Sequence, residues 1–270
     1  MLLILPTMSD ELIDIARRAG DAILEVYAGE FDVETKADAS PLTEADRRAH
    51  EIIVDGLRSL TPDLPIVSEE STPPPFAERR QWLRYWLVDP LDGTKEFIER
   101  NGEFTVNIAL IEAGEPVFGV VGVPANGAVY VGDCRERRAW RVDGEATTTL
   151  ATRTMTADAV AVVASRRHGG QRLERYLERL EDSFAVLTRV HLGSSLKFCI
   201  LAEGGADLYP RLGPTSEWDI AAAQAVLVAA GGEVRRLDGG PLVYNTGESF
   251  LNPDFVAVAD PDFPWRDKLT

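Results

Sequence analysis

The chain of 270 residues carries 28 basic and 44 acidic side chains, a formal net charge of −16, and 45% of its residues are hydrophobic. This composition is typical of a globular protein rather than a disordered one, and the length allows one large domain or two closely joined lobes. The acidic balance argues against a protein that coats nucleic acid through phosphate contacts, but it leaves a small phosphorylated substrate open, because bound cations can supply positive charge locally.

The chain begins with MLLILP, which is too short for a signal sequence or a membrane span and has no basic segment before it. We therefore expect no transmembrane segment, and Met8 is a candidate for the native start. Apolar residues then recur at helical spacing over residues 10–28, which predicts a helix with Ser9 as its N-cap. A second helix is expected to begin after Thr43, its N-cap, with Ile52, Ile53, Val54 and Leu57 on its apolar side.

Shorter elements are expected to follow. Residues 65–70, PIVSEE, predict a strand that ends at Ser68, and the proline-rich residues 71–80 predict an exposed loop. Three β-branched segments separated by Gly, Pro or Asn turns predict strands over residues 103–133. The remaining part alternates strand and helix, with a strand at residues 159–165, a helix at 170–182, a helix, turn and strand at 196–210, and a helix ended by glycines at 217–232.

The composition changes near residues 143–158, and we place a lobe boundary there. This gives an N-terminal α+β lobe of residues 1–150 and a C-terminal α/β lobe of residues 151–270. The sequence contains no P-loop, GxGxxG or GxSxG motif, so no motif indicates nucleotide-loop or serine-hydrolase chemistry.

The two cysteines, Cys134 and Cys199, cannot form a disulfide framework and lack the spacing of zinc ligands. We expect them to be reduced thiols in a cytoplasmic protein. Peripheral association with the inner face of the membrane stays open.

The motif DPLDGT raises a question of charge. Asp89 and Asp92 follow the apolar run Trp86–Val88 and lie three residues apart. Two carboxylates about 4 Å apart repel by roughly 4 kcal/mol at an intermediate effective dielectric. Either the turn is open to water, or a cation neutralises the two side chains.

Carboxylates occur at four places where a fold can bring them together. Each place has a purely structural alternative. Asp46 is placed to form a capping box with Thr43, and Asp219 to form one with Ser216. Glu69 with Glu70 could form a solvated turn, and the DPLD segment could be an ordinary turn.

Taken together, the four places favour a metal site. Ends of strands that face one crevice are where α/β folds place ligands, and Mg²⁺ prefers carboxylate and carbonyl oxygens. Pro90 fixes the backbone after the first aspartate, and the carbonyl of Leu91 can complete the ligand set. Gly93 lets the backbone and Thr94 come close to a phosphate. Two or three divalent ions would offset the acidity and bind an anionic substrate.

Several motifs resemble those of the inositol monophosphatase superfamily, over about residues 10–260. They are WLVDPLDGTKEF, the SEE segment upstream of it, and WDIAAAQAVLVAAGG near the C-terminus. Within the superfamily, KADASPLTEAD, GSSLKFCILAEGGADLYPR and ESFLNP resemble the bacterial 3′(2′),5′-bisphosphate nucleotidases. Lys95-Glu96-Phe97 favours the same branch, because inositol monophosphatases typically continue DGT with Thr-Asn-Phe.

The resemblance implies a layered α/β fold, an αβαβα sandwich like that of inositol monophosphatases and fructose bisphosphatases. It also implies a Mg²⁺-dependent, lithium-sensitive phosphomonoesterase with two or three bound ions. Such an enzyme removes the 3′-phosphate of adenosine 3′,5′-bisphosphate to give AMP, acts on the sulfated form, and clears a by-product of sulfate assimilation. An inositol or sugar monophosphatase is the alternative, and a catalytically silent nucleotide-binding protein is a third reading. Monomers and homodimers both occur among relatives.

The resemblance also implies residue roles. The metal ligands would be Glu69, Asp89, the carbonyl of Leu91, Asp92 and Asp219. Asp46 and Thr94 match the pair that activates the attacking water, and Glu70 would bind a further water. Substrate contacts would come from Glu69, Leu91, Asp92, Gly93, Thr94, His168, Gly193, Lys197 and Asp219. Gly193 would allow close approach of the base or ribose, and Lys197 would pair with phosphate. His168 could equally be a bystander and Lys197 a solvated helix residue, and Lys36 matches a family position without a firm role.

Overall fold

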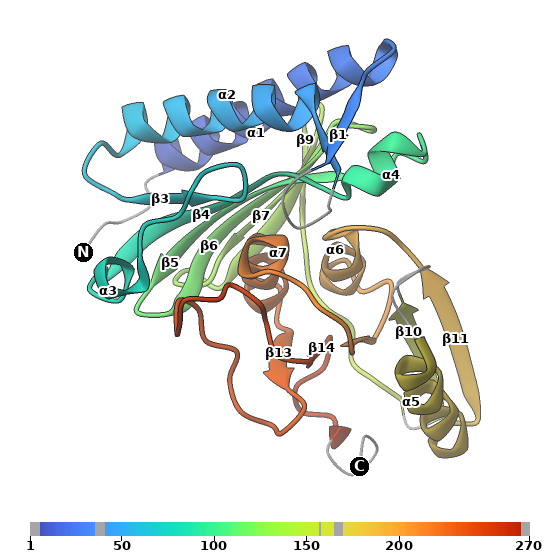
Figure 1. Cartoon of the computed structure of the whole chain (residues 1–270). Helices are drawn as coiled ribbons and strands as arrows, with labels where there is room; N and C mark the ends of the chain where they lie inside the picture. Colours follow the sequence, from blue (N-terminus) through green and yellow to red (C-terminus); the bar gives the residue numbers. More distant parts are fainter. Residues whose placement is uncertain (1–5, 36–40, 157, 165–169, 266–270) are drawn as a thin grey trace.

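The structure is a computed structural model that describes residues 6–35, 41–156, 158–164 and 170–265 (Figure 1). Helices and sheets alternate in five layers. A helix pair covers one face of a large sheet, a second helix pair covers its other face, and a smaller sheet and an outer helix follow. The predicted αβαβα sandwich is confirmed, although the outermost layer contains one helix among the described residues.

The first layer consists of α1 (Pro6–Ala28) and α2 (Glu44–Leu60), which lie side by side. They bury the apolar stripes that the sequence predicts against the large sheet, where Trp86 and Phe104 are fully buried. A short antiparallel pair, β1 (Val33–Thr35) and β2 (Pro41–Thr43), lies between the two helices in sequence.

The large sheet has seven strands in chain order and is antiparallel except for its parallel β3–β4 pair. Its strands are β3 (Ile66–Ser68), β4 (Arg84–Asp92), β5 (Thr105–Glu112), β6 (Glu115–Val123), β7 (Ala128–Asp133), β8 (Arg138–Asp143) and β9 (Ala146–Thr149). Two short helices, α3 (Phe76–Arg79) and α4 (Thr94–Ile98), precede and follow β4.

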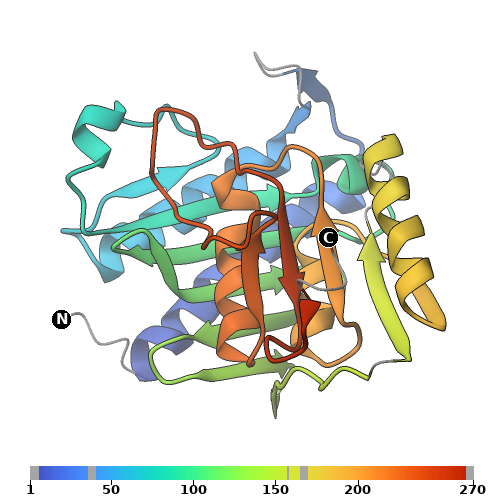
Figure 2. The ribbon, with the colours of Figure 1, turned by 90° about the horizontal axis from the view of Figure 1, so that it is seen from below.

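The C-terminal part contributes the remaining layers. The smaller sheet has the order β11-β10-β12-β14-β13 and lies in front of the large sheet in Figure 2. Helices α6 and α7 lie between the sheets, and α5 packs on β11. The bounds are β10 (Ala159–Ala164), α5 (Gly170–Ser183), β11 (Val186–His191), α6 (Leu196–Ala202), β12 (Leu208–Arg211), α7 (Glu217–Ala229), β13 (Glu233–Arg236) and β14 (Phe255–Val258).

Helix α7 lies directly on the backbone of the large sheet because two glycines face it. Gly119 and Gly132 are paired on β6 and β7. A Cβ atom at Gly119 would lie 2.2 Å from the carbonyl oxygen of Ala222, and one at Gly132 would lie 2.5 Å from the Cα of Val226. Protein interiors are close-packed, so only glycine allows this approach. The contact fixes α7, whose first turn carries Asp219.

Three sequence expectations need correction. The first helix begins at Pro6, so Ser9 lies inside it and is not its N-cap. Residues 71–80 are not simply an exposed loop, because they contain α3 and the buried side chain of Arg79. Strand β4 does not end before the DPLD segment but continues to Asp92.

Other expectations have different outcomes. The predicted strands at residues 103–133 and the helix that begins after Thr43 are confirmed. The lobe boundary near residues 143–158 stays a prediction. No helix in the described part of the chain combines the length and apolar character needed to cross a membrane.

Candidate active site

Three carboxylates from separate elements form an acidic cluster. Glu69 follows β3, Asp89 lies in β4, and Asp219 lies in the first turn of α7. One carboxylate oxygen from each lies within 4.8 Å of the other two. The parallel pairing of β3 with β4 explains how Glu69 and Asp89 meet, since parallel strands end at the same edge of a sheet. Asp219 joins them from a segment 130 residues after Asp89 in the chain.

The DPLD segment is a bulge rather than an ordinary turn. Asp89 pairs with Asn107 and Asp92 with Thr105, so β4 contains one residue more than β5 over this stretch. Pro90 lies at the bulge, where its missing N–H does not interrupt the ladder. Asp89 is buried, and its Oδ1 accepts a hydrogen bond from the Leu91 amide at 3.0 Å. Asp92 faces the same cavity but lies outside the three-carboxylate cluster, so its role as a ligand stays a prediction.

Both capping boxes that the sequence suggests are present, and Asp219 is also part of the three-carboxylate cluster. Oδ2 of Asp46 accepts hydrogen bonds from the Thr43 amide at 2.8 Å and the Thr43 hydroxyl at 2.6 Å. The other oxygen of Asp46 lies 3.4 Å from the hydroxyl of Thr94. The Ser216 amide donates to Asp219 at 2.9 Å. A capping role therefore does not exclude a role in the site, and the catalytic role of Asp46 stays a prediction.

A cavity of about 250 Å³ lies beside the cluster and contains most of the predicted site. Predicted residues that line it are Glu69, Asp89, Leu91, Asp92, Gly93, Thr94, Gly193, Lys197 and Asp219. Glu70 lies partly exposed in the turn after β3 and is not among the described lining residues. His168 and Lys36 lie outside the described residues.

Two buried cations face the acidic groups in this cavity. Lys197 on α6 is 6% exposed, and its Nζ donates to the carbonyl of Ser194 at 2.5 Å. Burial lowers the pKa of Lys197 to about 8, against the opposing effect of the Asp92 charge. Arg211, at the end of β12, is 8% exposed and donates to the carbonyls of Gly213 and Pro214. The reading of Lys197 as a solvated helix residue is wrong.

The electrostatics of the carboxylates fit a divalent cation. Burial raises the pKa of Asp92 to about 6, although the charge of Lys197 opposes the shift. Burial, and then the charge of Asp92, raises the pKa of Asp219 well above its ordinary value. A bound cation favours the ionised form of such groups. The donor set of the cluster consists of carboxylate oxygens alone, which suits hard cations such as Mg²⁺.

Gly193 has a packing role that the sequence does not reveal. Its amide donates to the carboxylate of Glu103 at 2.7 Å. A Cβ atom at this position would lie 2.9 Å from the Cγ of Glu96 and 3.0 Å from the Cβ of Glu103. These neighbours leave little room for a side chain, and the predicted close approach of a nucleotide stays a prediction.

Sequence reasoning missed several polar residues of the site. The hydroxyl of Ser195 donates to the carbonyl of Asp219 at 2.7 Å and accepts from the amide of Asn107 at 2.9 Å. Both residues thus hold the first turn of α7 on the side that faces β5. Neither these two residues nor Arg211 has a local sequence signal, because their partners lie far away in the chain.

A second hollow, of about 620 Å³, lies along β13 and residues 261–265. Its arginines already form ion pairs: Arg235 with Glu233, and Arg236 with Asp238. The only cluster of potential metal ligands among the described residues is the one formed by Glu69, Asp89 and Asp219. We therefore take the smaller, acidic cavity as the active site.

Comparison with known proteins identifies the family. The model of the inositol monophosphatase family matches residues 5–259, and the chain belongs to that family. Among curated relatives, the 3′(2′),5′-bisphosphate nucleotidase CysQ of Escherichia coli strain K12 is 51% identical over 250 residues, which cover 92% of this chain and 98% of that protein. CysQ of Buchnera aphidicola is 41% identical over 256 residues, 93% of this chain and 94% of that protein.

Solved structures of related proteins have the same fold. The crystal structure of CysQ from Bacteroides thetaiotaomicron superimposes with a TM-score of 0.84 at 39% identity, covering 97% of this chain and 100% of that one. SuhB from Bartonella henselae superimposes with a TM-score of 0.74 over 97% of this chain and 96% of that one, and at 23% identity it supports the fold alone. The predicted resemblance to the inositol monophosphatase superfamily is confirmed.

Proposed function

We propose that the protein is a Mg²⁺-dependent 3′(2′),5′-bisphosphate nucleotidase. Its substrates are adenosine 3′,5′-bisphosphate and the sulfated form of that nucleotide, so it acts in sulfur assimilation and nucleotide recycling. The observation that carries the proposal is the 51% identity to a nucleotidase over 98% of that protein's length. The three-carboxylate cluster supports it as a site that could hold Mg²⁺. The two buried cations support it because phosphate ester hydrolysis needs positive charge around phosphorus.

The reaction is the hydrolysis of one phosphate ester. The oxygen of water forms a bond to the 3′-phosphorus, the bond from phosphorus to O3′ breaks, and O3′ takes up a proton, which gives AMP and inorganic phosphate. Thr94 can donate its hydroxyl proton to Asp46, 3.4 Å away, which leaves its lone pairs able to accept a hydrogen bond from the water. Because Thr43 holds the other oxygen of Asp46, the carboxylate keeps its orientation. Glu70 binds a further water in this proposal.

The metal site of the proposal contains Glu69, Asp89, the carbonyl of Leu91, Asp92 and Asp219, with two or three Mg²⁺ ions. When bound, Mg²⁺ supplies positive charge to the phosphoryl oxygens and makes a water more acidic. The chain's own contribution is to hold five oxygen-bearing groups in the wall of the cavity, with β4 supplying three of them.

The second phosphate of the substrate distinguishes a nucleoside bisphosphate from a simple monophosphate. We assign it to Lys197 and Arg211, whose charges are buried in the cavity wall. Their positive charges attract an anionic group of the substrate, and Arg presents a fork that matches phosphate. Gly93, Thr94 and Gly193 line the same cavity and complete the proposed substrate contacts, together with His168 outside the described residues.

The remaining parts of the proposal concern location and assembly. Cys134 and Cys199 are both free, which agrees with a reducing cytoplasmic compartment. The partner is a small nucleotide, not a nucleic acid polymer, and the protein acts as a monomer or homodimer.

A substrate panel tests the function. Phosphate release and AMP formation are measured with adenosine 3′,5′-bisphosphate, its sulfated form, inositol monophosphate and a sugar monophosphate, each with Mg²⁺, with Mg²⁺ plus Li⁺, and with EDTA. We expect turnover of both nucleotides that requires Mg²⁺ and falls with Li⁺. Brisk hydrolysis of inositol or sugar monophosphate without nucleotide turnover would support the alternative phosphatase. Tight nucleotide binding without any turnover would support a binding protein.

A further inference from the structure

Arg79 is a fully charged side chain in the protein interior, and the proposed chemistry does not use it. It ends α3 and is 1% exposed, beside Arg80, which is exposed. Removing a guanidinium from water costs several kcal/mol unless its donors are satisfied. The structure therefore raises the question of what this residue holds in place.

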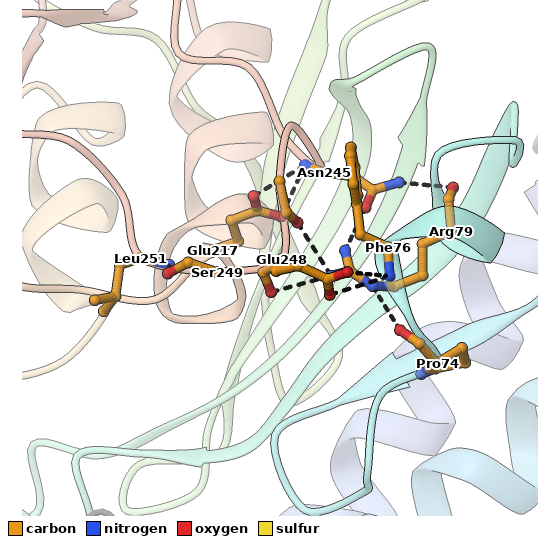
Figure 3. Close-up of polar contacts among 9 residues, drawn as sticks. Pro74, Phe76, Arg79, Glu217, Asn245, Glu248, Ser249 and Leu251 are labelled. Atoms are coloured by element: carbon orange, nitrogen blue, oxygen red, sulfur yellow. Dashed lines mark hydrogen bonds and ion pairs between the residues drawn. The ribbon is translucent and has the colours of Figure 1, made fainter.

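The partners of Arg79 lie mainly in one distant segment, residues 245–252 (Figure 3). Its Nη1 donates to the side chain of Asn245, and its Nη2 donates to the carbonyls of Gly247 and Glu248, each at 3.1 Å. The guanidinium lies 4.2 Å from the centre of the Phe250 ring. On its own side, Nε donates to the carbonyl of Pro74 at 2.8 Å.

The α3 region and this segment also bind each other around Arg79. The side-chain amide of Asn245 donates to the Arg79 carbonyl at 2.8 Å. The carboxylate of Glu248 accepts from the Phe76 amide at the start of α3. Figure 2 shows the segment before β14 looping out toward α3. Arg79 is thus the centre of a two-sided contact between the first half of the chain and its C-terminal part.

The same segment is bonded to the residues that begin α7. The Glu217 amide donates to the Phe250 carbonyl at 2.7 Å. The side chain of Asn252 donates to the Ser216 carbonyl at 2.7 Å, and Leu251 bridges to Ser216. The carboxylate of Glu217 in turn accepts from the Asn245 backbone amide at 2.9 Å (Figure 3). The segment therefore holds the N-cap of α7 from two sides.

These contacts form a path that leads from Arg79 through residues 245–252 to the acidic cluster. Ser216 is the N-cap of α7, and its amide donates to the carboxylate of Asp219. Asp219 is the one member of the cluster that comes from the C-terminal part of the chain, whereas Glu69 and Asp89 lie close to Arg79 in sequence. Every step from Arg79 to Asp219 is a direct contact.

We propose that Arg79 is a positioning residue for the cation site: through residues 245–252 it sets where Asp219 stands relative to Glu69 and Asp89. The inference rests on the proposed function in that the cluster binds Mg²⁺. Partners one step outside a metal site typically change metal affinity or activity by about 10- to 100-fold when they are removed. Arg79 acts through a longer path, so the lower end of that range applies.

Direct metal binding provides the test, with Arg79→Met and Arg79→Lys against Arg80→Met as the matched exposed control. Mg²⁺ affinity is measured by calorimetry on metal-free protein without substrate, well below each variant's unfolding midpoint. We expect R79M to weaken Mg²⁺ binding about tenfold. R79K should fall between R79M and wild type, because lysine keeps the charge but not the planar fork. R80M should match wild type.

Kinetics separate positioning from a merely structural role. In R79M the Mg²⁺ concentration for half-maximal activity should rise in step with the calorimetric shift, while KM for the nucleotide at saturating Mg²⁺ stays near the wild-type value. A folded R79M with wild-type Mg²⁺ affinity, or with the same shift as R80M, would overturn the inference.

Asn252→Ala cuts the same path at its other end and gives a second, independent reading. It should weaken Mg²⁺ binding as well, and its effect should be less than additive with R79M, because both act through one network. If R79M does not fold, the Mg²⁺ affinities of R79K and N252A provide the test. Wild-type Mg²⁺ affinity in both variants would overturn the proposal. Failure of the proposed function is a different result: the nucleotide panel shows no turnover, whereas the binding shifts do not depend on any substrate.

Discussion

The packing of α7 on the large sheet makes a strong prediction for Gly119→Ala. The added Cβ would lie 2.2 Å from the Ala222 oxygen and 2.9 Å from the Cα of the same residue. These are backbone atoms, which cannot rotate away, so α7 must move. Overpacked cores lose about 1–3 kcal/mol, and a clash with backbone belongs at the upper end of that range. A loss of about 3 kcal/mol lowers the unfolding midpoint of a protein of this size by roughly 6–12 °C.

The displacement should also reach the site. Ala222 lies one turn after Asp219 on α7, so a helix pushed off the sheet carries the carboxylate with it. Misplacement of a catalytic group by about 1 Å can cost about 100-fold in rate. Thermal unfolding and Mg²⁺-dependent phosphate release would both be measured, with Gly29→Ala as the control, since a Cβ there meets only an ordinary contact at 3.7 Å. If G119A matches G29A in midpoint and activity, α7 does not lie against the sheet backbone as described.

Three further predictions address single groups. Asp219→Asn keeps an oxygen that can accept the hydrogen bond from the Ser216 amide, so we expect an intact fold by circular dichroism. The rate of phosphate release should fall at least ~100-fold, and a near-wild-type rate would exclude Asp219 as a ligand. Thr94→Ala should lower kcat by about 10²–10⁴-fold while Thr94→Ser stays active, and equal losses in both would argue against a role for the hydroxyl. Burial lowers the pKa of half-buried His50 below 6.5, so the unfolded chain binds the proton more readily and the free energy of unfolding falls as pH drops below 6.5 toward the folded pKa. The denaturant midpoint should therefore fall less between about pH 7.5 and 5.5 in His50→Gln than in wild type. An equal fall in the two proteins would contradict this prediction.

The parts of the site that follow from local sequence could be predicted. Asp46 and Asp219 each stand three residues after a capping residue, and the capping box fixes their carboxylates with short-range bonds alone. The DPLD motif comes directly after an apolar run, so its aspartates were expected near the end of a strand, and it forms the last residues of β4. Its bulge was not expected, because the extra residue in β4 appears only when β5 is paired beside it.

Residues whose role depends on contacts with distant parts of the chain could not be predicted. Arg79 reads as one arginine in a proline-rich, charged stretch, and its burial depends on carbonyls more than 160 residues away. In the sequence, Gly193 suggests room for a ligand, whereas in the structure Glu96 and Glu103 leave little room for a side chain at this position. The glycines at 119 and 132 lie in ordinary strand patterns, and only the approach of α7 explains them.

The use of aspartate at both capping boxes connects helix stability with the geometry of the site. A capping box more often has Glu or Gln at its third helical position. Aspartate is one methylene shorter, so a carboxylate tied to the N-cap amide has fewer rotamers left than a glutamate would have. At Asp46 one oxygen satisfies the amide and hydroxyl of Thr43, and the other is turned toward Thr94. The bond that begins each helix therefore also orients a carboxylate of the predicted site, at no additional cost in side-chain entropy.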